Sequence, residues 1–106
     1  MTSFEDRRKG FEKEFERNQE LAFRITVRRN RLFGLWAAER LGLPADQAEA
    51  YARTVVEADF QAPGDSDVIA KVKEDLAAVG ISLPEPTLRT ELERAVAEAR
   101  RQLASS

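Results

Sequence analysis

Cysteine and histidine are both absent from this sequence of 106 residues. Without cysteine, the chain has no disulfide, no thiolate nucleophile and no thiolate metal site. Without histidine, it lacks the commonest general base, the commonest metal ligand and the side chain that usually titrates near neutral pH. A glycine-rich phosphate loop and a G-x-S-x-G nucleophile motif are missing as well. We therefore predict that the protein is not an enzyme and uses no metal ion or other cofactor.

The sequence also has no long apolar stretch and little net charge. No segment approaches the roughly 20 apolar residues that cross a bilayer, and the first ten residues are too charged for a secretory signal. We therefore expect a cytoplasmic protein without direct membrane insertion. The formal net charge of −2 provides no general attraction to nucleic acid. The acids follow helical charge patterns, and a carboxylate-only enzyme is an alternative that would require a buried pair of them.

Apolar residues recur at helical spacing in four segments that glycine and proline separate. We predict helices over residues 19–41, 44–60, 66–79 and 87–103. Gly42 and Gly80 would end the first and the third of them. No segment has the period-two pattern of a strand. The prediction is an all-α fold, a four-helix bundle over residues 19–106, and a chain of this length suits one domain with one core.

Each predicted helix has an apolar stripe that would face the core. On the first helix the stripe consists of Leu21, Ile25, Leu32 and Leu35, widened by Phe33 and Trp36. On the third helix it consists of Ile69, Val72, Leu76 and Val79. We expect Asp65 or Ser66 to cap the third helix. Gly34 is unfavourable inside a helix, so we expect it to let a second helix approach closely in the core.

Residues 1–18 are almost entirely charged, except for Phe4, Phe11 and Phe15. Spacings of seven and four residues place these three rings near one face of a helix. A lone helix of this length is marginal in water, so we expect a mobile N-terminal arm that becomes helical when its Phe face meets a partner. Such a segment is a helix-in-groove ligand that folds on binding. The alternative is that the three rings fold back onto the bundle.

A basic block follows the arm and consists of Arg24, Arg28, Arg29 and Arg31. No acidic residue occurs between Leu21 and Ala38. One interpretation is an exposed helix face that pairs with acids of the second helix, such as Glu49 or Glu57. The other is a site for an acidic partner or a phosphate-bearing ligand, which would make the protein a small nucleotide- or anion-binding regulatory bundle. Aromatic residues between the arginines are compatible with nucleic acid, but the acidic balance of the chain argues against it.

Several segments of the sequence together resemble a known family. They are residues 4–12 (FEDRRKGFE), 28–39 (RRNRLFGLWAAE), 49–52 (EAYA) with 55–60 (VVEADF), and 63–65 (PGD). The chain resembles the zeta subunit of alphaproteobacterial F-type ATP synthases, the natural ATPase inhibitor of those enzymes. The resemblance covers nearly the whole chain and is weakest after Pro84.

The resemblance implies a four-helix fold with a mobile inhibitory region at the N-terminus. In this family the region enters the catalytic interface between alpha and beta subunits, becomes helical there and blocks rotation in the hydrolysis direction. By position, the partner-binding residues would be Phe4, Arg7, Arg8, Phe11, Lys13 and Phe15. The partners would be the alpha and beta subunits of the catalytic head, with gamma as a further candidate. The protein would be monomeric when free and peripherally associated with the membrane-bound synthase.

Overall fold

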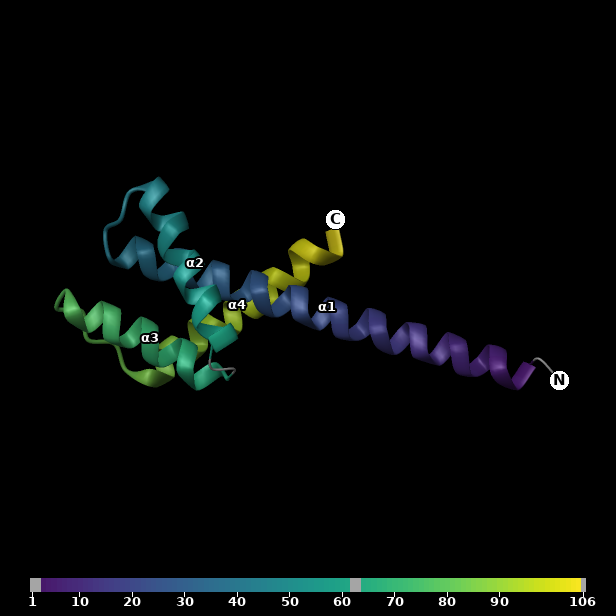
Figure 1. The fold of residues 1–106 in the computed structure, drawn as a ribbon. Helices are drawn as coiled ribbons and strands as arrows, with labels where there is room; N and C mark the ends of the chain where they lie inside the picture. Colours follow the sequence, from purple (N-terminus) through teal and green to yellow (C-terminus); the bar gives the residue numbers. More distant parts are fainter. Residues whose placement is uncertain (1–2, 62–63, 106) are drawn as a thin grey trace.

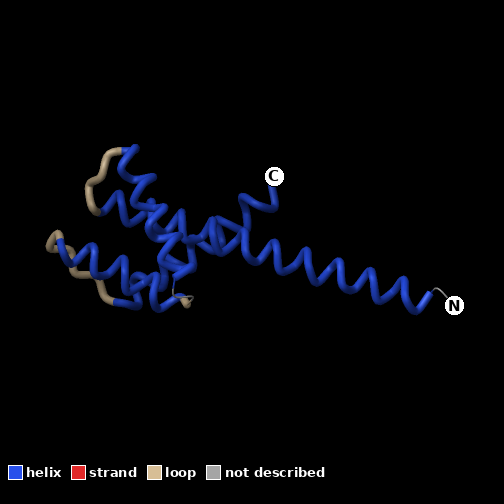
Figure 2. Tube along the Cα trace, in the orientation of Figure 1, coloured by secondary structure: helices blue, strands red, loops and turns tan. Residues whose placement is uncertain are grey.

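The computed structural model describes the backbone of residues 3–61 and 64–105 and the side chains of residues 17–61 and 64–104. Within these residues the helices are α1 (Ser3–Arg40), α2 (Ala45–Gln61), α3 (Asp65–Ala78) and α4 (Glu85–Ser105). Figure 2 shows short connections between them and no strand in the described part. The predicted all-α fold with four helices is therefore confirmed. None of the described helices is long and apolar enough to cross a membrane.

α1 continues through the boundary that we expected at residue 18. One helix runs from Ser3 to Arg40, so the arm and the first helix of the bundle share a single backbone element. Figure 1 shows the N-terminal half of α1 projecting away from the other three helices, which gather around its C-terminal half. The molecule is accordingly elongated, with extents of 67 × 25 × 22 Å. The helix has no break at residue 18, and the mobility of the arm stays a prediction.

The C-terminal half of α1 lies at the centre of the bundle. It packs most extensively against α2 and α4 and also contacts α3, which in turn packs against α2 and α4. The core between the four helices is aliphatic apart from one aromatic ring of α1. Its buried residues are Phe33, Ala37, Val55, Val68, Ile69, Val72, Leu76, Leu88, Leu92 and Ala95. Tertiary packing therefore stabilises α1 over one half of its length.

Gly34 allows α1 and α2 to approach closely. A Cβ atom at this position would lie 2.7 Å from the Cα atom of Ala52 and 3.2 Å from Cγ2 of Val55. Because atoms do not pack at 2.7 Å, any side chain at this position would push the two helices apart. The predicted role of Gly34 in core packing is confirmed. Phe33 and Trp36 stack beside it, with ring centroids 5.7 Å apart.

α1 and α3 both end at the glycines that the sequence indicated. At the end of α3, the amide of Gly80 donates to the carbonyl of Ala77 at 3.0 Å. The amide of Ile81 donates to the carbonyl of Leu76 at 2.9 Å. With a φ of 85° at Gly80, these two bonds form a Schellman motif. Gly42, with a φ of 75°, occupies the same position after α1.

Two residues of the predicted apolar stripes are exposed instead of buried. Val79 is 57% exposed, because α3 ends one residue before it and Ile81 packs against the core after the turn. Leu21 is 47% exposed and lines an open cleft with Leu103 and Ala104 near the end of α4, where the core does not cover it. The predicted stripes are therefore wrong at these two ends and right at their centres, around Phe33 and Val72.

The start of α3 also differs from the prediction. Its N-cap is Gly64, which makes no side-chain hydrogen bond to the helix. Asp65 is the first residue of α3, and its carboxylate binds Arg29 of α1 at 2.9 Å instead of capping the helix. The predicted cap at Asp65 or Ser66 is therefore wrong, because a contact with another helix takes the carboxylate.

Candidate functional site

The N-terminal half of α1 stands apart from the bundle (Figure 1). The predicted partner-binding residues all lie on it; they are Phe4, Arg7, Arg8, Phe11, Lys13 and Phe15. The structure places their backbone in α1, whereas their side chains lie outside the described ones. Their role in binding stays a prediction, based on the family resemblance and, for the three phenylalanines, on their spacing.

Large apolar side chains are exposed where α1 emerges from the bundle. Phe23 of α1 is 55% exposed, and Phe60 at the end of α2 is 57% exposed. Their ring centroids lie 5.8 Å apart at an interplanar angle of 39°, so the rings form a pair on the surface. We did not predict this pair. Phe60 follows the half-buried Val56 by one helical turn, and this spacing is the signal that could have identified it.

The Phe23–Phe60 pair borders a groove of about 340 Å³ between α1 and α2. Its walls are mostly apolar and are formed by Ala22, Phe23, Thr26, Val27, Asn30, Val56, Asp59 and Phe60. The polar groups in these walls have partners inside the protein. The Thr26 hydroxyl donates to the Ala22 carbonyl at 3.0 Å, and the Asn30 amide donates to the Asp59 carboxylate at 2.9 Å. The groove therefore suits an apolar side chain better than a polar ligand.

A second cleft, of about 540 Å³, lies between α1 and α4 and shares Phe23 and Val27 with the groove. It combines apolar side chains with guanidinium groups and is lined by Phe23, Arg24, Val27, Arg28, Arg31 and Leu103. Three arginines of the basic block therefore share one surface. Arg28 donates to the side-chain oxygen of Gln102 at 3.0 Å, and this neutral amide does not cancel the positive charge.

The other two arginines of the cleft form exposed ion pairs. Arg24 binds Glu20 at 2.7 Å, one helical turn earlier on α1. Arg31 binds Glu49 of α2 at 2.6 Å, so pairing of the basic block with Glu49 is confirmed. Exposed ion pairs contribute about 0–1 kcal/mol. A partner with its own carboxylates could therefore replace either pair at little cost.

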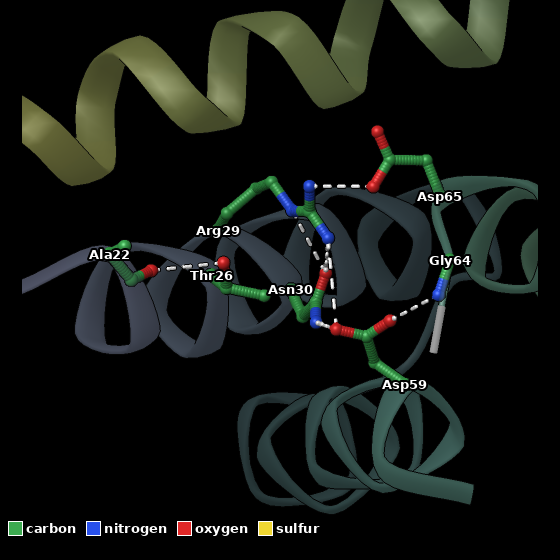
Figure 3. A network of polar contacts seen from close by, with 7 residues as sticks. All are labelled: Ala22, Thr26, Arg29, Asn30, Asp59, Gly64 and Asp65. Atoms are coloured by element: carbon green, nitrogen blue, oxygen red, sulfur yellow. Dashed lines mark hydrogen bonds and ion pairs between the residues drawn. The ribbon is translucent and has the colours of Figure 1, made fainter. Parts of the chain in front are cut away.

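Arg29 lies apart from this surface, although we expected it on the basic face. Its side chain is buried, and its Nη1 binds Oδ1 of Asp65 at 2.9 Å (Figure 3). Its Nε and Nη2 donate to the side-chain oxygen of Asn30 at 3.1 and 3.0 Å. The Asn30 amide reaches Asp59, whose other oxygen accepts from the amide of Gly64 at 3.3 Å. The guanidinium therefore ties α1 to the end of α2 and the start of α3.

This network of Arg29, Asn30, Asp59 and Asp65 holds helices together and offers no ligand site. Among the described side chains, every buried nitrogen or oxygen atom has a hydrogen-bond partner. The same part of the chain contains no group of three or more His, Cys, Asp or Glu side chains placed to hold a metal ion. We did not predict the role of Asn30, because its partner Asp59 lies 29 residues away in the sequence.

A second polar contact joins α2 to α3. The hydroxyl of Tyr51 donates to Oδ2 of Asp75 at 2.8 Å, and the ammonium of Lys71 binds the same oxygen at 3.0 Å. Burial raises the pKa of Tyr51 above its ordinary value, and the hydrogen bond and negative charge of Asp75 raise it further. The phenol therefore stays protonated at neutral pH and acts as a donor.

One protein-family model matches this chain over both the arm and the bundle. The family model described as ATPase inhibitor subunit zeta matches residues 1–102. A structure determined by solution NMR is 46% identical in sequence, with a TM-score of 0.69, and the match covers 78% of this chain and 94% of that chain. No curated protein matches the sequence. The resemblance seen in the sequence is confirmed, and this chain belongs to the family of ATPase inhibitor subunit zeta, whose role is regulatory.

Proposed function

We propose that the protein inhibits ATP hydrolysis by an F-type ATP synthase by inserting the N-terminal half of α1 at a catalytic interface between an alpha and a beta subunit, where it blocks rotation. Membership of the zeta family supports the inhibitory role. The observation that carries the mechanism is the projection of α1 beyond the bundle (Figure 1). A protein that obstructs a rotary enzyme needs a segment that can enter it and a body that stays outside.

The dimensions of the arm suit this role. A helix rises about 1.5 Å per residue, so residues 3–18 span about 24 Å. The two shorter extents of the molecule are 25 and 22 Å, so the arm is about as long as the bundle is wide. Such an arm would carry Phe4 deep into a crevice while the bundle remains at the entrance.

The composition of the arm indicates how it would bind. Phe4, Phe11 and Phe15 are spaced by seven and four residues, and burying one Phe side chain is worth about 1.5–3 kcal/mol. Three buried rings would offset much of the conformational entropy that a short segment loses on ordering. Acidic and basic residues balance along residues 1–18, so patterned contacts would orient the arm more than net charge.

The proposal also defines the partners and the place of action. The arm would contact alpha and beta subunits of the catalytic head, and its tip would approach the gamma subunit. The free protein would be a monomer that associates peripherally with the membrane-bound synthase on the cytoplasmic side.

Deletion of residues 1–18 tests this function. We expect the truncated chain to keep the thermal unfolding transition of the bundle and to lose inhibition of ATP hydrolysis by the purified cognate synthase. As a full-length control, Phe4, Phe11 and Phe15 are each replaced by Ser, which keeps the length of the arm. Inhibition that persists in both variants at the wild-type potency would remove the arm from the mechanism.

A second candidate function is supported by the arginine-lined cleft between α1 and α4. Guanidinium groups of Arg24, Arg28 and Arg31 line one depression, and planar guanidinium groups bind phosphate well. A nucleotide or another anion could occupy it and regulate the bundle. Titration of ATP and ADP into labelled protein tests this function. Saturable NMR shifts centred on Arg28 and Arg31 at micromolar nucleotide would favour it, and their absence would exclude it.

A further inference from the structure

The groove and the cleft at the base of the arm form one continuous surface. They meet along Phe23 and Val27, which line both. We define the Phe23 surface by its apolar residues and its arginines, which are Phe23, Val27, Phe60, Leu103, Arg24, Arg28 and Arg31. Both of its aromatic rings, Phe23 and Phe60, are more than half exposed. Exposed aromatic side chains of this size, gathered beside two hollows, are typical of a protein-binding surface.

Among the described residues, arginine is the only charged type that lines the cleft, while Glu20 and Glu49 pair with Arg24 and Arg31 through exposed ion pairs that a partner's carboxylates can replace. Arg24, Arg28 and Arg31 border the cleft, and α1 has no acidic residue between Leu21 and Ala38. Asp59, the acidic residue of the groove, is already bound by Asn30 and by the amide of Gly64. The complement of this surface is therefore an apolar segment with carboxylates along one edge.

The Phe23 surface also continues the face of the arm. The spacing of seven and four residues that relates Phe4, Phe11 and Phe15 continues to Ala22 and Thr26, which line the groove. Because α1 is one uninterrupted helix from Ser3 to Arg40, positions 4, 11 and 15 share a helical register with Ala22 and Thr26, which line the groove. A partner that holds this face of the arm would meet the groove about 10 Å further along the helix.

We propose that the protein docks on the ATP synthase through a second site, the Phe23 surface. This surface would bind an acidic amphipathic helix of the synthase, at the rim of the crevice that receives the arm. A helix fits because the groove and the cleft each lie between two helices, and a third helix packs well into such a hollow. This inference rests on the proposed function of the arm. It assigns to the bundle a direct contribution to affinity, in addition to its role as a body that stays outside.

The test compares two full-length variants for binding to the purified cognate synthase and for inhibition of ATP hydrolysis. The surface variant carries Phe23→Gln and Phe60→Gln, and the arm variant carries Phe11→Ser and Phe15→Ser. Both phenylalanines of the surface variant are exposed, so its circular dichroism and melting temperature should match the wild type. We expect its affinity to fall about tenfold, with complete inhibition at saturating concentration, because a buried aromatic anchor dominates such contacts. Val79→Gln, at a site equally exposed but at the far end of α3, should leave affinity unchanged.

The two variants separate failure of this inference from failure of the proposed function. If the arm variant loses inhibition while the surface variant binds within about twofold of the wild type, the Phe23 surface does not dock and the arm mechanism stands. If the arm variant inhibits like the wild type, the proposed function fails, whatever the surface variant does.

Replacement of Arg24, Arg28 and Arg31 by Gln tests the charge of the partner. We expect about fivefold weaker binding at low ionic strength and a smaller difference at high ionic strength, because salt screens these contacts. Unchanged affinity for the synthase, combined with loss of ATP-induced NMR shifts, would assign the arginines to a nucleotide and overturn the inference. A second copy of this chain is the other candidate that could cover the Phe23 surface. A wild-type dimer in light scattering that the surface variant abolishes would also overturn it.

Discussion

The two halves of α1 have the same helical backbone but very different surroundings. Residues 17–24 are all exposed, whereas Phe33, Gly34, Ala37 and Ala38 further along the same helix are buried. Figure 1 shows the corresponding change in the fold, since the other helices cover only the C-terminal half. The buried half is stabilised by tertiary contacts, whereas the exposed residues 17–24 depend more on local helix propensity and on their charge pattern. Substitutions in the two halves should therefore affect different properties, unfolding free energy in one and inhibition in the other.

The largest effect on stability is expected from Phe33→Ala in the buried half. Phe33 is fully buried in the core, and removing such a ring costs about 3–5 kcal/mol of unfolding free energy. Urea unfolding followed by fluorescence of Trp36, which stacks on Phe33, or by circular dichroism measures the loss. Val79→Ala, at an exposed position, serves as the control and should change stability little. A small loss at Phe33 would contradict the distinction between the two halves.

Gly34→Ala should destabilise the protein although alanine is the better helix former. The added Cβ would lie 2.7 Å from a backbone atom of α2, and overpacking of this kind costs about 1–3 kcal/mol. The gain in helix propensity of about 1 kcal/mol offsets only part of this cost, because the clash is with backbone that cannot move aside as a side chain can. Thermal unfolding gives the sign directly. A variant that melts at a higher temperature than the wild type would show that α1 and α2 can separate without loss.

Tyr51→Phe should have a smaller effect, confined to the bundle and dependent on pH. The lost hydrogen bond to Asp75 costs about 0.5–1.5 kcal/mol at neutral pH. In the wild type, the raised pKa of Tyr51 means that the unfolded state releases the phenol proton first. The contribution is therefore complete below about pH 10, the ordinary pKa of tyrosine, and is lost as the pH rises above it. Unfolding free energies at pH 7 and pH 11 should show a smaller decline in the variant, and equal declines would disprove this assignment.

The smallest expected effect is from Gly10→Ala, a glycine in the projecting half. Alanine favours the helix by up to about 1 kcal/mol over glycine, so the arm would lose less entropy on binding. Inhibition should become up to about fivefold more potent, while the melting temperature of the bundle stays the same. Titration of ATP hydrolysis with both proteins measures the difference. Weaker inhibition would mean that the partner approaches Gly10 too closely for a side chain.

Much of the fold follows from local signals in the sequence. Gly42 and Gly80 end α1 and α3 because a left-handed residue completes the Schellman motif, and this requirement is local. Gly34 was identified because glycine inside a helix needs a compensating contact. Exposure of Val79 and Leu21 could not be predicted from periodicity, since it depends on where neighbouring helices end.

The polar network and the Phe23 surface depend on contacts distant in sequence. In the sequence, Arg29 belongs to a basic block. In the structure it is buried and binds Asp65, which lies 36 residues later. Phe23 and Phe60 become a pair only when α1 and α2 lie side by side. The amphipathic arm is inferred from three phenylalanines among charges, and its role in binding stays a prediction.

The absence of a break within α1 has a mechanical consequence. Force applied along the axis of the arm reaches Phe33 and Gly34 without an intervening loop that could stretch. Extraction of α1 would have to slide its buried half past α2 and α4 at once, so the whole interface would resist the load together. If the arm seats as proposed, a load on it would pass along one continuous helix to the packed core of the bundle.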